Sequence, residues 1–353
     1  MPAKDKSIRP ARRSSVTSSA ATVRDVANLA QVSTATVSRT LNAPDLVRPE
    51  VRERVSNAIQ KLGYIPNDSA RALRQNQTRF IGVVVPTLSY ALYADFYAAV
   101  EEQLSALGYF PVLSTTDYDL DVEAEQITRL SRQGAQGLIL VGRVRSSRAA
   151  SYLAATGLPF VSTYATDPLG RDGTIGFDNE AAINEVVNHL ASLGHRRIAM
   201  LSGLRSNLND RAIGRANGFI SAVRKHGIAS PDWIFEGPYT IESGRRALCA
   251  LLDRGIDATA IVCGSDMLAI GGLQECKARG IRVPRDLSIV GFDDLEIAAH
   301  IDPPLTTVAV PSREQGRLAA QAIVDLCNGR QCPPNAVLPT HMVVRETTAG
   351  PGG

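Results

Sequence analysis

The chain has 353 residues, of which 44% are hydrophobic and 21% charged, so it is long enough for more than one globular domain. No segment approaches the roughly 18 consecutive apolar residues that a membrane-spanning helix needs. The basic start of the chain has no apolar stretch behind it, which argues against a secretory signal. We interpret residues 1–19 as a disordered basic tail of a cytoplasmic protein. A mitochondrial-type transit segment is a weaker alternative.

The net charge of +3 conceals an uneven distribution along the chain. Residues 1–79 contain fourteen Lys and Arg against six Asp and Glu, a net charge of +8, which leaves −5 on the remainder. A basic head on an acidic body is typical of a DNA-binding module joined to a regulatory body. Charge asymmetry alone is often only solvated surface, so this interpretation depends on finding a DNA-binding motif in the head.

Cysteine and histidine spacing supports neither a metal site nor a disulfide framework. The cysteines are odd in number and form no CxxC pair, and the five histidines are scattered. We expect reduced cysteines used for packing, no metal and no cofactor. The cysteines are Cys249, Cys263, Cys276, Cys327 and Cys332.

Residues 22–42 have the pattern of two short helices joined by a turn. Apolar residues recur in the first helix at the spacing of an amphipathic helix, and Thr22 with Asp25 can form a capping box at its start. Ser33 is a natural N-cap for the second helix, which is expected to bury Val37 and Leu41 against the first. Such a helix-turn-helix places its second helix in the major groove of DNA. The alternative is an ordinary helical pair in a small bundle.

The outward face of the second helix is small and hydroxylic with one arginine, which suits base edges and phosphates. Its residues are Thr34, Ala35, Ser38 and Arg39. A third helix is expected from Pro49, a residue favoured in the first helical turn, to Gly63. Residues 68–75 form a further helical stretch that is too short to be stable alone in water.

From Phe80 onward, apolar strand patterns alternate with helical patterns of 10 to 15 residues. Two consecutive sets predict an α/β core made of two parallel-sheet subdomains. Three of the helices are expected to begin at Phe96, Gly214 and Met267. Ligands of such sheets bind at the carboxyl ends of the strands. The loops there are 86–93, 162–164, 207–215, 239, 265–266 and 293–294.

The head of the chain resembles the DNA-binding headpiece of the lactose-repressor (LacI) family of bacterial transcription regulators. The matching sequence motifs are Asp25-Val26-Ala27, Val32-Ser33, Ala35-Thr36-Val37-Ser38-Arg39, Leu41-Asn42, Arg52-Glu53-Arg54-Val55, Leu62-Gly63-Tyr64-Ile65-Pro66-Asn67 and Ala70-Arg71-Ala72-Leu73. Further motifs of the family in the core are Leu193-Gly194-His195-Arg196, Gly291-Phe292-Asp293-Asp294, Pro304-Leu305-Thr306-Thr307 and Val344-Arg345-Glu346. Gln31 stands in the turn where the family usually has glycine, so we expect a slightly altered turn.

The resemblance implies an all-α helix-turn-helix headpiece at 20–66, a hinge helix and linker at 67–78, and a type I periplasmic-binding-protein-like α/β core at 79–350. It divides the core into an N-subdomain, about 79–177 plus 308–335, and a C-subdomain, about 178–307 plus 336–350. In the family, the hinge helix folds when two chains meet on the operator, and the residue matching Leu73 wedges into the minor groove. An inert linker is the alternative.

Two sets of site residues follow from the motifs and the resemblance together. The predicted DNA contacts are Thr22, Ser33, Thr34, Ala35, Thr36, Ser38, Arg39, Asn42, Tyr64, Asn67, Leu73 and Arg74. The predicted effector contacts are Tyr90, Tyr93, Tyr164, Asn209, Arg215, Tyr239, Ser265 and Asp293, with Arg215 and Asp293 as polar anchors. The alternatives are a surface ion pair for Arg215, a turn cap for Asp293, and an N-cap for Asp266. Many relatives have Asn-Pro-Phe-Phe where this chain has Tyr-Ala-Leu-Tyr, which limits any transfer of ligand identity.

The sequence therefore predicts a transcriptional repressor that binds a palindromic operator as a homodimer under the control of a small molecule. A sugar or sugar acid is the expected effector, and a purine or other non-sugar metabolite is the alternative. A solute-binding protein fits less well because of the DNA-binding motif. The sequence has no GxGxxG after a strand, GxxxxGK[ST], GxSxG or HExxH, so no enzyme is expected. A dimer is favoured over a tetramer because no leucine heptads follow Glu346. We expect Arg215→Ala to abolish the ligand response without unfolding the protein.

Overall fold

The computed structural model describes residues 21–64, 78–167, 173–205, 209–228, 233–330 and 335–352. Contacts divide the chain into two compact units, Met1–Asn76 and Gln77–Gly353, which we call the headpiece and the core and describe separately. The expected tail, the hinge helix, and the predicted DNA contacts Asn67, Leu73 and Arg74 lie outside the described residues. No helix in the described ranges combines the length and apolar character needed to cross a membrane.

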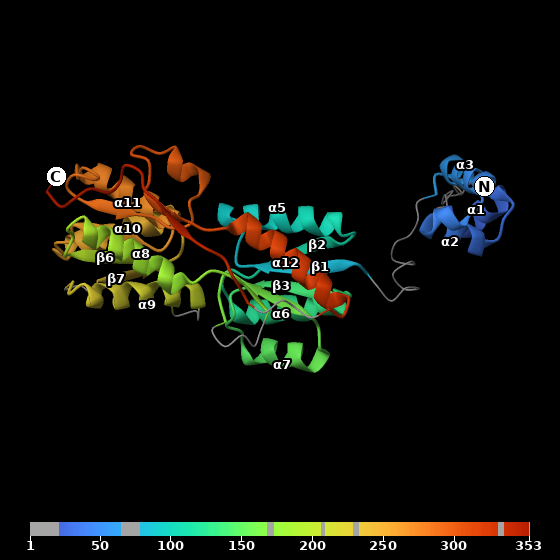
Figure 1. Cartoon of the computed structure of the whole chain (residues 1–353), viewed down its shortest axis with the longest axis horizontal. Coiled ribbons are helices and arrows are strands. Elements are labelled where there is room, and N and C mark those ends of the chain that lie inside the picture. Colours follow the sequence, from blue (N-terminus) through green and yellow to red (C-terminus); the bar gives the residue numbers. More distant parts are fainter. Residues whose placement is uncertain are drawn as a thin grey trace, which may run out of the picture. The chain divides into compact units, whose positions relative to one another are not determined.

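The headpiece is the expected three-helix unit. It consists of α1 (Val23–Ala30), α2 (Thr34–Asn42), the 3₁₀ turn η1 (Pro44–Leu46) and α3 (Pro49–Leu62). A small apolar core holds these helices together, made of Val26, Ala27, Ala30, Val37, Val55 and Ala58. Its elements appear in blue in Figure 1.

Side-chain caps and left-handed residues set the helix ends of the headpiece. Thr22 and Asp25 form the predicted capping box, and the Ser33 hydroxyl accepts the N–H of Thr36 at 3.1 Å. Gln31 ends α1 at φ 53°, so the turn keeps the left-handed conformation that glycine would favour. Gly63 ends α3 in the same way, at φ 58°.

The predicted burial of Leu41 is wrong. Leu41 is 36% exposed, and Thr40 is buried in its place beside the fully buried Val37. The Thr40 hydroxyl can be buried because it donates to the carbonyl oxygen of Thr36 at 2.9 Å. The buried face of α2 therefore includes Thr40, three residues after Val37. It does not include the more apolar Leu41, four residues after Val37.

The first sheet of the core, which defines the N-subdomain, has six parallel strands in the order β11-β5-β4-β3-β1-β2. Helices α5 and α12 lie together on one face, and α6 and α7 lie on the other (Figure 1). The strands are β1 (Phe80–Val85), β2 (Phe110–Thr115), β3 (Gly137–Val141), β4 (Phe160–Thr163), β5 (Thr174–Gly176) and β11 (Ala336–Val337). The helices are α5 (Ala91–Ala106), α6 (Leu120–Arg132), α7 (Ser147–Thr156) and α12 (Ser312–Cys327).

The second sheet, which defines the C-subdomain, has four parallel strands in the order β7-β6-β8-β9. Helices α8 and α9 pack against each other, as do α10 and α11. The strands are β6 (Ile198–Gly203), β7 (Ile234–Gly237), β8 (Ala260–Cys263) and β9 (Ser288–Val290). The helices are α8 (Asn179–Ser192), α9 (Asp210–Lys225), α10 (Ile241–Asp253), α11 (Asp266–Arg279) and the 3₁₀ turn η2 (Glu296–Ala299).

The chain passes between the subdomains near Phe177 and again along an antiparallel pair, β10 (Thr307–Ala309) with β12 (His341–Val343). One predicted boundary needs correction. Residues 336–350 were assigned to the C-subdomain, but Ala336 and Val337 form β11, which pairs with β5 of the N-subdomain sheet. The third crossing therefore lies after Val337.

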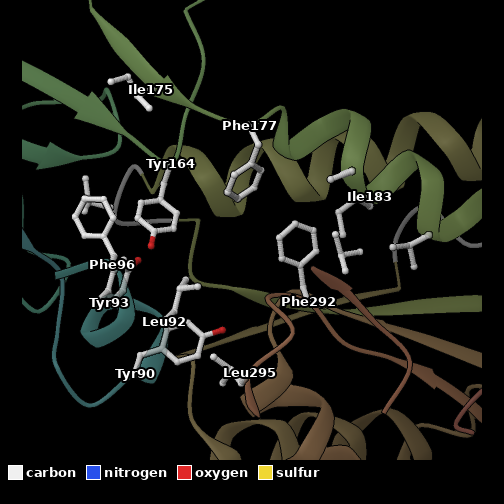
Figure 2. Packing of buried hydrophobic residues seen from close by; sticks show 14 of the residues in the cluster. Tyr90, Leu92, Tyr93, Phe96, Tyr164, Ile175, Phe177, Ile183, Phe292 and Leu295 are labelled. Carbon is white, nitrogen blue, oxygen red and sulfur yellow. The ribbon is translucent and has the colours of Figure 1, made fainter. Parts of the chain in front are cut away.

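Several helices begin earlier than predicted, and this places more residues at the strand ends. Helix α5 begins at Ala91 instead of Phe96, and α9 begins at Asp210 instead of Gly214. Helix α11 begins at Asp266 with Ser265 as its N-cap, so the suggested capping role of Asp266 is wrong. Phe177 and Phe292, with ring centroids 6.1 Å apart, lie where the subdomain cores join (Figure 2).

Candidate DNA-binding face and ligand cleft

The described part of the headpiece presents a solvent-facing surface on α2. Thr34, Ala35 and Arg39 are exposed, as predicted, while Thr36 and Ser38 are half-buried. Because Val37 and Thr40 hold the opposite side of α2 in the core, this face is free to enter a groove of DNA.

The other predicted DNA contacts differ in how far they are already engaged. The Thr22 hydroxyl donates to Asp25 at 2.7 Å, and the Ser33 hydroxyl lies 2.9 Å from that of Thr36. These groups hold the starts of α1 and α2, so they position the helices in addition to any contact they make. Tyr64 packs partly buried against the headpiece core. The side chain of Asn42 is outside the described set.

In the core, the structure brings the predicted effector residues to facing ends of the two sheets. Most are buried between the subdomains, and Tyr239 is half-buried. The N-subdomain contributes Tyr90, Tyr93 and Tyr164, and the C-subdomain contributes Asn209, Arg215, Tyr239, Ser265 and Asp293.

Arg215 and Asp293 form the polar centre of this buried junction between the subdomains, which we call the cleft. The guanidinium of Arg215 donates to Asn179 Oδ1 at 2.9 Å and to the Gly264 carbonyl at 2.6 Å, and it lies 3.7 Å from Asp293 Oδ1. It also stacks 3.9 Å from the ring centroid of Phe292. Arg215 is only 4% exposed, so the alternative of a surface ion pair is wrong.

Burial determines the ionisation of Asp293. It raises the pKa of Asp293 to about 6, although the neighbouring Arg215 and the hydroxyl of Tyr90 act in the opposite direction. Its φ of 111° is unusual for a residue other than glycine. Such backbone conformations persist where surrounding contacts impose them, and they are common at binding sites.

Tyrosine rings surround the polar centre. Tyr90 stacks on Tyr239 with centroids 6.2 Å apart and planes 18° apart, and Tyr93 meets Tyr164 edge to face at 5.5 Å. Tyr118, which was not predicted, lies 6.1 Å from Tyr239. Figure 2 shows Tyr90, Tyr93 and Tyr164 close together at the junction of the subdomains. Flat apolar faces beside a charged pair suit a ring with polar edges.

Ser265 and Asp266 support the cleft from beneath. The Ser265 hydroxyl accepts the N–H of Leu268 at 3.2 Å, and Ser265 is fully buried. Asp266 accepts the Thr307 hydroxyl at 2.6 Å and the N–H of Leu295 at 2.7 Å. Burial, together with the nearby charge of Asp293, raises the pKa of Asp266 to about 8. Asp266 thus joins α11 to the crossing strand β10.

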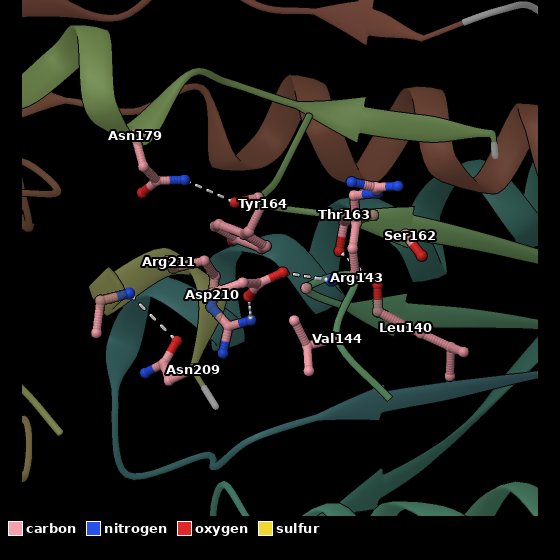
Figure 3. Close-up of polar contacts among 12 residues, drawn as sticks. Leu140, Arg143, Val144, Ser162, Thr163, Tyr164, Asn179, Asn209, Asp210 and Arg211 are labelled. Carbon is pink, nitrogen blue, oxygen red and sulfur yellow. Dashed lines mark hydrogen bonds and ion pairs between the residues drawn. The ribbon is translucent and has the colours of Figure 1, made fainter. Parts of the chain in front are cut away.

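A second contact between the subdomains forms at the start of α9 (Figure 3). Asn209 caps this helix, and Asp210 accepts the backbone N–H of Arg143 in the N-subdomain at 2.6 Å. The other oxygen of Asp210 accepts from Arg211 at 2.7 Å. Beside them lies a cavity of about 30 Å³, lined in part by Tyr118 and Glu123. The sequence analysis did not name Arg143, Asp210 or Arg211 as site residues, although Asp210 and Arg211 lie in the predicted loop 207–215. The contact of Asp210 with Arg143 joins segments far apart in the sequence and requires the fold.

Comparisons with known proteins agree with this geometry. Residues 22–67 match the model of bacterial regulatory proteins of the lacI family, and residues 187–348 match that of a periplasmic binding protein-like domain. The transcriptional repressor CytR of Escherichia coli strain K12 is 33% identical over 331 residues, which cover 93% of this chain and 96% of CytR. The chain belongs to the lacI family.

Other members of the lacI family match over similar lengths. The regulator CelR of Thermobifida fusca is 34% identical, covering 92% of this chain and 98% of CelR. A lac repressor dimer bound to operator and the anti-inducer ONPF superposes with a TM-score of 0.85 at 30% identity, covering 94% of this chain and all of that chain. A CelR–cellobiose complex superposes with a TM-score of 0.70 at 31% identity, covering 93% and 99%.

As a lacI-family member, the protein is a ligand-responsive, DNA-binding transcriptional regulator. Its headpiece is the helix-turn-helix DNA-binding unit, and its core has the periplasmic-binding-protein-like fold. CytR, DegA of Bacillus subtilis strain 168 and CelR are all transcriptional regulators. Within the described residues, no group of three or more His, Cys, Asp or Glu side chains is arranged to hold a metal ion.

Proposed function

We propose that this lacI-family regulator represses transcription by binding a palindromic operator as a homodimer in the cytoplasm. The exposed residues Thr34, Ala35 and Arg39 on α2 would read bases in each half-site. The remaining predicted contacts would hold the DNA backbone, and Leu73 with Arg74 would enter the minor groove between the half-sites. Two similarities support this proposal: CytR is a repressor, and the matched lac repressor structure is a dimer on its operator.

The proposed effector is a sugar or sugar acid bound between the subdomains. The observation that carries this proposal is the buried pair of Arg215 and Asp293, in and beside which some polar atoms lack hydrogen-bond partners among the described residues. Among the described residues, the Asp293 Oδ1 atom and the Tyr239 hydroxyl are buried and find no hydrogen-bond partner. Unsatisfied buried groups are costly, and ligand hydroxyls would satisfy them. The matched CelR structure contains cellobiose, which supports this class of ligand.

A surface on the C-subdomain would suit the proposed dimer. A hollow of about 360 Å³ is lined by Ile270, Leu273 and Ile301, among other residues. One helical turn before Ile301, the side chain of Ile297 is 47% exposed. Exposed apolar side chains beside an apolar hollow are typical of protein interfaces.

The experiment that tests the function uses the full-length protein and the palindrome upstream of its own gene. Sugars, sugar acids and purines are screened for thermal stabilisation, and each compound that stabilises the protein is tested for its effect on operator affinity. We expect a sugar or sugar acid to change both. If only purines change both, the protein is still a ligand-controlled regulator, but the proposed effector class is wrong.

The matched variants for this screen are Tyr239→Phe and Tyr152→Phe. The first removes an unpartnered hydroxyl from the cleft, and the second alters a tyrosine on α7, outside the cleft. We expect Tyr239→Phe to weaken effector binding several-fold and Tyr152→Phe to leave it unchanged. Equal binding by both variants would remove Tyr239 from the site.

A further inference from the structure

Tyr90 lies at the start of α5 in the N-subdomain, but its hydroxyl is bonded in the C-subdomain. The Tyr90 hydroxyl donates to Asp293 Oδ2, and its ring stacks on Tyr239. The side chain is only 4% exposed. Figure 2 shows Tyr90 extending from the start of α5 toward Leu295, in the loop that follows β9. A single side chain therefore spans the cleft between the subdomains.

The contacts of Tyr90 are those that a ligand would make. A phenol presents a flat apolar face, which here lies on Tyr239, and one hydroxyl donor, which here meets the carboxylate of Asp293. Asp293 is the group proposed to accept from the effector, and Arg215 lies 3.7 Å from its Oδ1 atom. An effector that used Asp293 Oδ2 as well as the unpartnered Oδ1 would need the position that the Tyr90 hydroxyl holds.

We propose that Tyr90 is an internal ligand, which occupies the effector position and holds the subdomains together when no effector is bound. This inference rests on the proposed function of the cleft. The effector binds by displacing the phenol, so its chemistry resembles that of the phenol. It presents a ring face to Tyr239 and a hydroxyl or N–H donor to Asp293.

The loop before Tyr90 is suited to this exchange. Strand β1 ends at Val85, and Tyr90 precedes the first residue of α5 without making a side-chain cap. Leu88 in this loop is 49% exposed and Ser89 is also exposed, so these two residues are not held in the core. Tyr93 packs edge to face on both Tyr90, at 5.9 Å, and Tyr164, at 5.5 Å, so the contact with Tyr164 would remain when Tyr90 is displaced. Displacement of Tyr90 then changes the start of α5, the helix that packs against α12.

Competition with an internal ligand lowers the apparent affinity for the effector. Apparent affinity scales with the fraction of molecules in which the site is available. Removing the Tyr90 side chain removes the competitor, but it also removes a buried ring. A binding experiment alone would therefore confound the two effects, and the test requires a probe that replaces the missing group.

The test is chemical complementation of Tyr90→Ala in the full-length protein with phenol as the probe. Truncation to alanine removes a phenol-sized group from the cleft, and added phenol can refill the space. We expect millimolar phenol to raise the melting temperature of Tyr90→Ala but not that of the wild type. Benzene, which lacks the hydroxyl, should raise it much less. Tyr152→Ala is the matched control, and phenol should not stabilise it.

Two results would overturn the proposal: phenol stabilises Tyr90→Ala no more than the wild type, or benzene is as effective as phenol. If Tyr90→Ala does not fold, a double-mutant cycle of Tyr90→Phe and Asp293→Gly replaces it, since glycine removes the acceptor and suits the φ of 111° at this position. We expect the hydrogen-exchange increase at residues 87–93 in the double variant to be no larger than in either single variant. Additive increases would contradict the proposal.

The two proposals can fail separately. If phenol does not complement Tyr90→Ala but a sugar still changes operator binding by the wild type, the internal ligand is wrong and the proposed function stands. If phenol complements the variant but no sugar, sugar acid or purine changes operator binding, Tyr90 still bridges the cleft and the proposed effector class is wrong.

Discussion

Burial shifts the pKa of the Asp293 carboxyl, and this shift affects both folding stability and the proposed ligand binding. Its pKa of about 6 means that the carboxylate, which accepts hydrogen bonds, predominates above that pH. The folded pKa lies above the unfolded value of 3.8, so the folded state holds more protons in the window between them. The contribution of this group to stability therefore falls as pH rises from about 4 to about 6. Ligand binding depends on pH in the opposite sense, because it needs the carboxylate.

Effector binding should depend on pH through the titration of Asp293. The affinity of the wild type should fall as pH is lowered from 7 to 5, since protonated Asp293 accepts fewer hydrogen bonds. Titration calorimetry across this range measures the effect. Asp293→Asn should bind more weakly at pH 7 and lose most of the pH dependence. A wild-type affinity that does not change across this window would exclude Asp293 as the anchor.

Arg215 illustrates a site residue whose structural role could not be predicted from sequence. The expectation that Arg215→Ala leaves folding intact ignored the contacts with Asn179, Gly264 and Phe292. Removing one partner of a buried pair costs about 3–5 kcal/mol, so we now expect a loss of that order in urea unfolding. Arg246→Ala breaks an exposed pair with Glu242 and should cost at most about 1 kcal/mol. Similar losses for both variants would contradict the buried role.

At the scale of elements, the spacing of apolar residues in the sequence predicted several helices and strands. It did not predict the contacts between elements that are far apart in the sequence. Helix α3 has nearly the expected bounds because its apolar spacing is strong. Helix α12 was not predicted, since its buried face is made largely of small residues such as Ala319 and Ala320. Its close approach to α5 explains them: a Cβ at Gly316 would lie 2.5 Å from the Phe96 carbonyl oxygen. The short strands β5, β10, β11 and β12 depend on distant partners and have too few residues for a pattern.

The contact between α9 and the loop after β3 depends on a glycine. Gly142 has φ +80°, and a Cβ there would lie 2.0 Å from a guanidinium nitrogen of Arg211. Gly142→Ala should therefore destabilise the core by about 1–3 kcal/mol through backbone strain and collision. It should also speed hydrogen exchange at the Arg143 amide, which bonds Asp210.

Gly157→Ala is the matched control for this prediction. Gly157 has φ +63°, but a Cβ there would lie more than 4 Å from every atom of the described residues. Alanine at this position should therefore cost only backbone strain, about 1 kcal/mol. Urea unfolding and exchange at Arg143 separate the two variants. If they behave alike, the collision with Arg211 does not matter and the contact is not held by the glycine.

At the scale of the whole molecule, regulation needs two chains and two arrangements of the cleft. A ligand changes operator affinity only if it binds those arrangements with different affinities. We expect Ile297→Asp to weaken dimerisation at least tenfold in analytical ultracentrifugation, because it places a charge beside the apolar hollow on α11. Val344→Asp alters a side chain that is 59% exposed and should leave dimerisation unchanged. A fully dimeric Ile297→Asp would place the interface elsewhere.

The resemblance predicted the family, the two-part architecture and the position of the cleft. It could do so because the motifs of the headpiece and the loops at the strand ends are each short, continuous stretches of sequence. It could not predict that a tyrosine from one subdomain would bond an aspartate of the other, which requires the fold. The most direct measurement is operator affinity of the full-length protein with and without each stabilising compound. We predict that at least one sugar or sugar acid changes this affinity tenfold or more, and that Asp293→Asn loses the response. Unchanged operator affinity with every compound that binds the cleft would contradict regulation through this site.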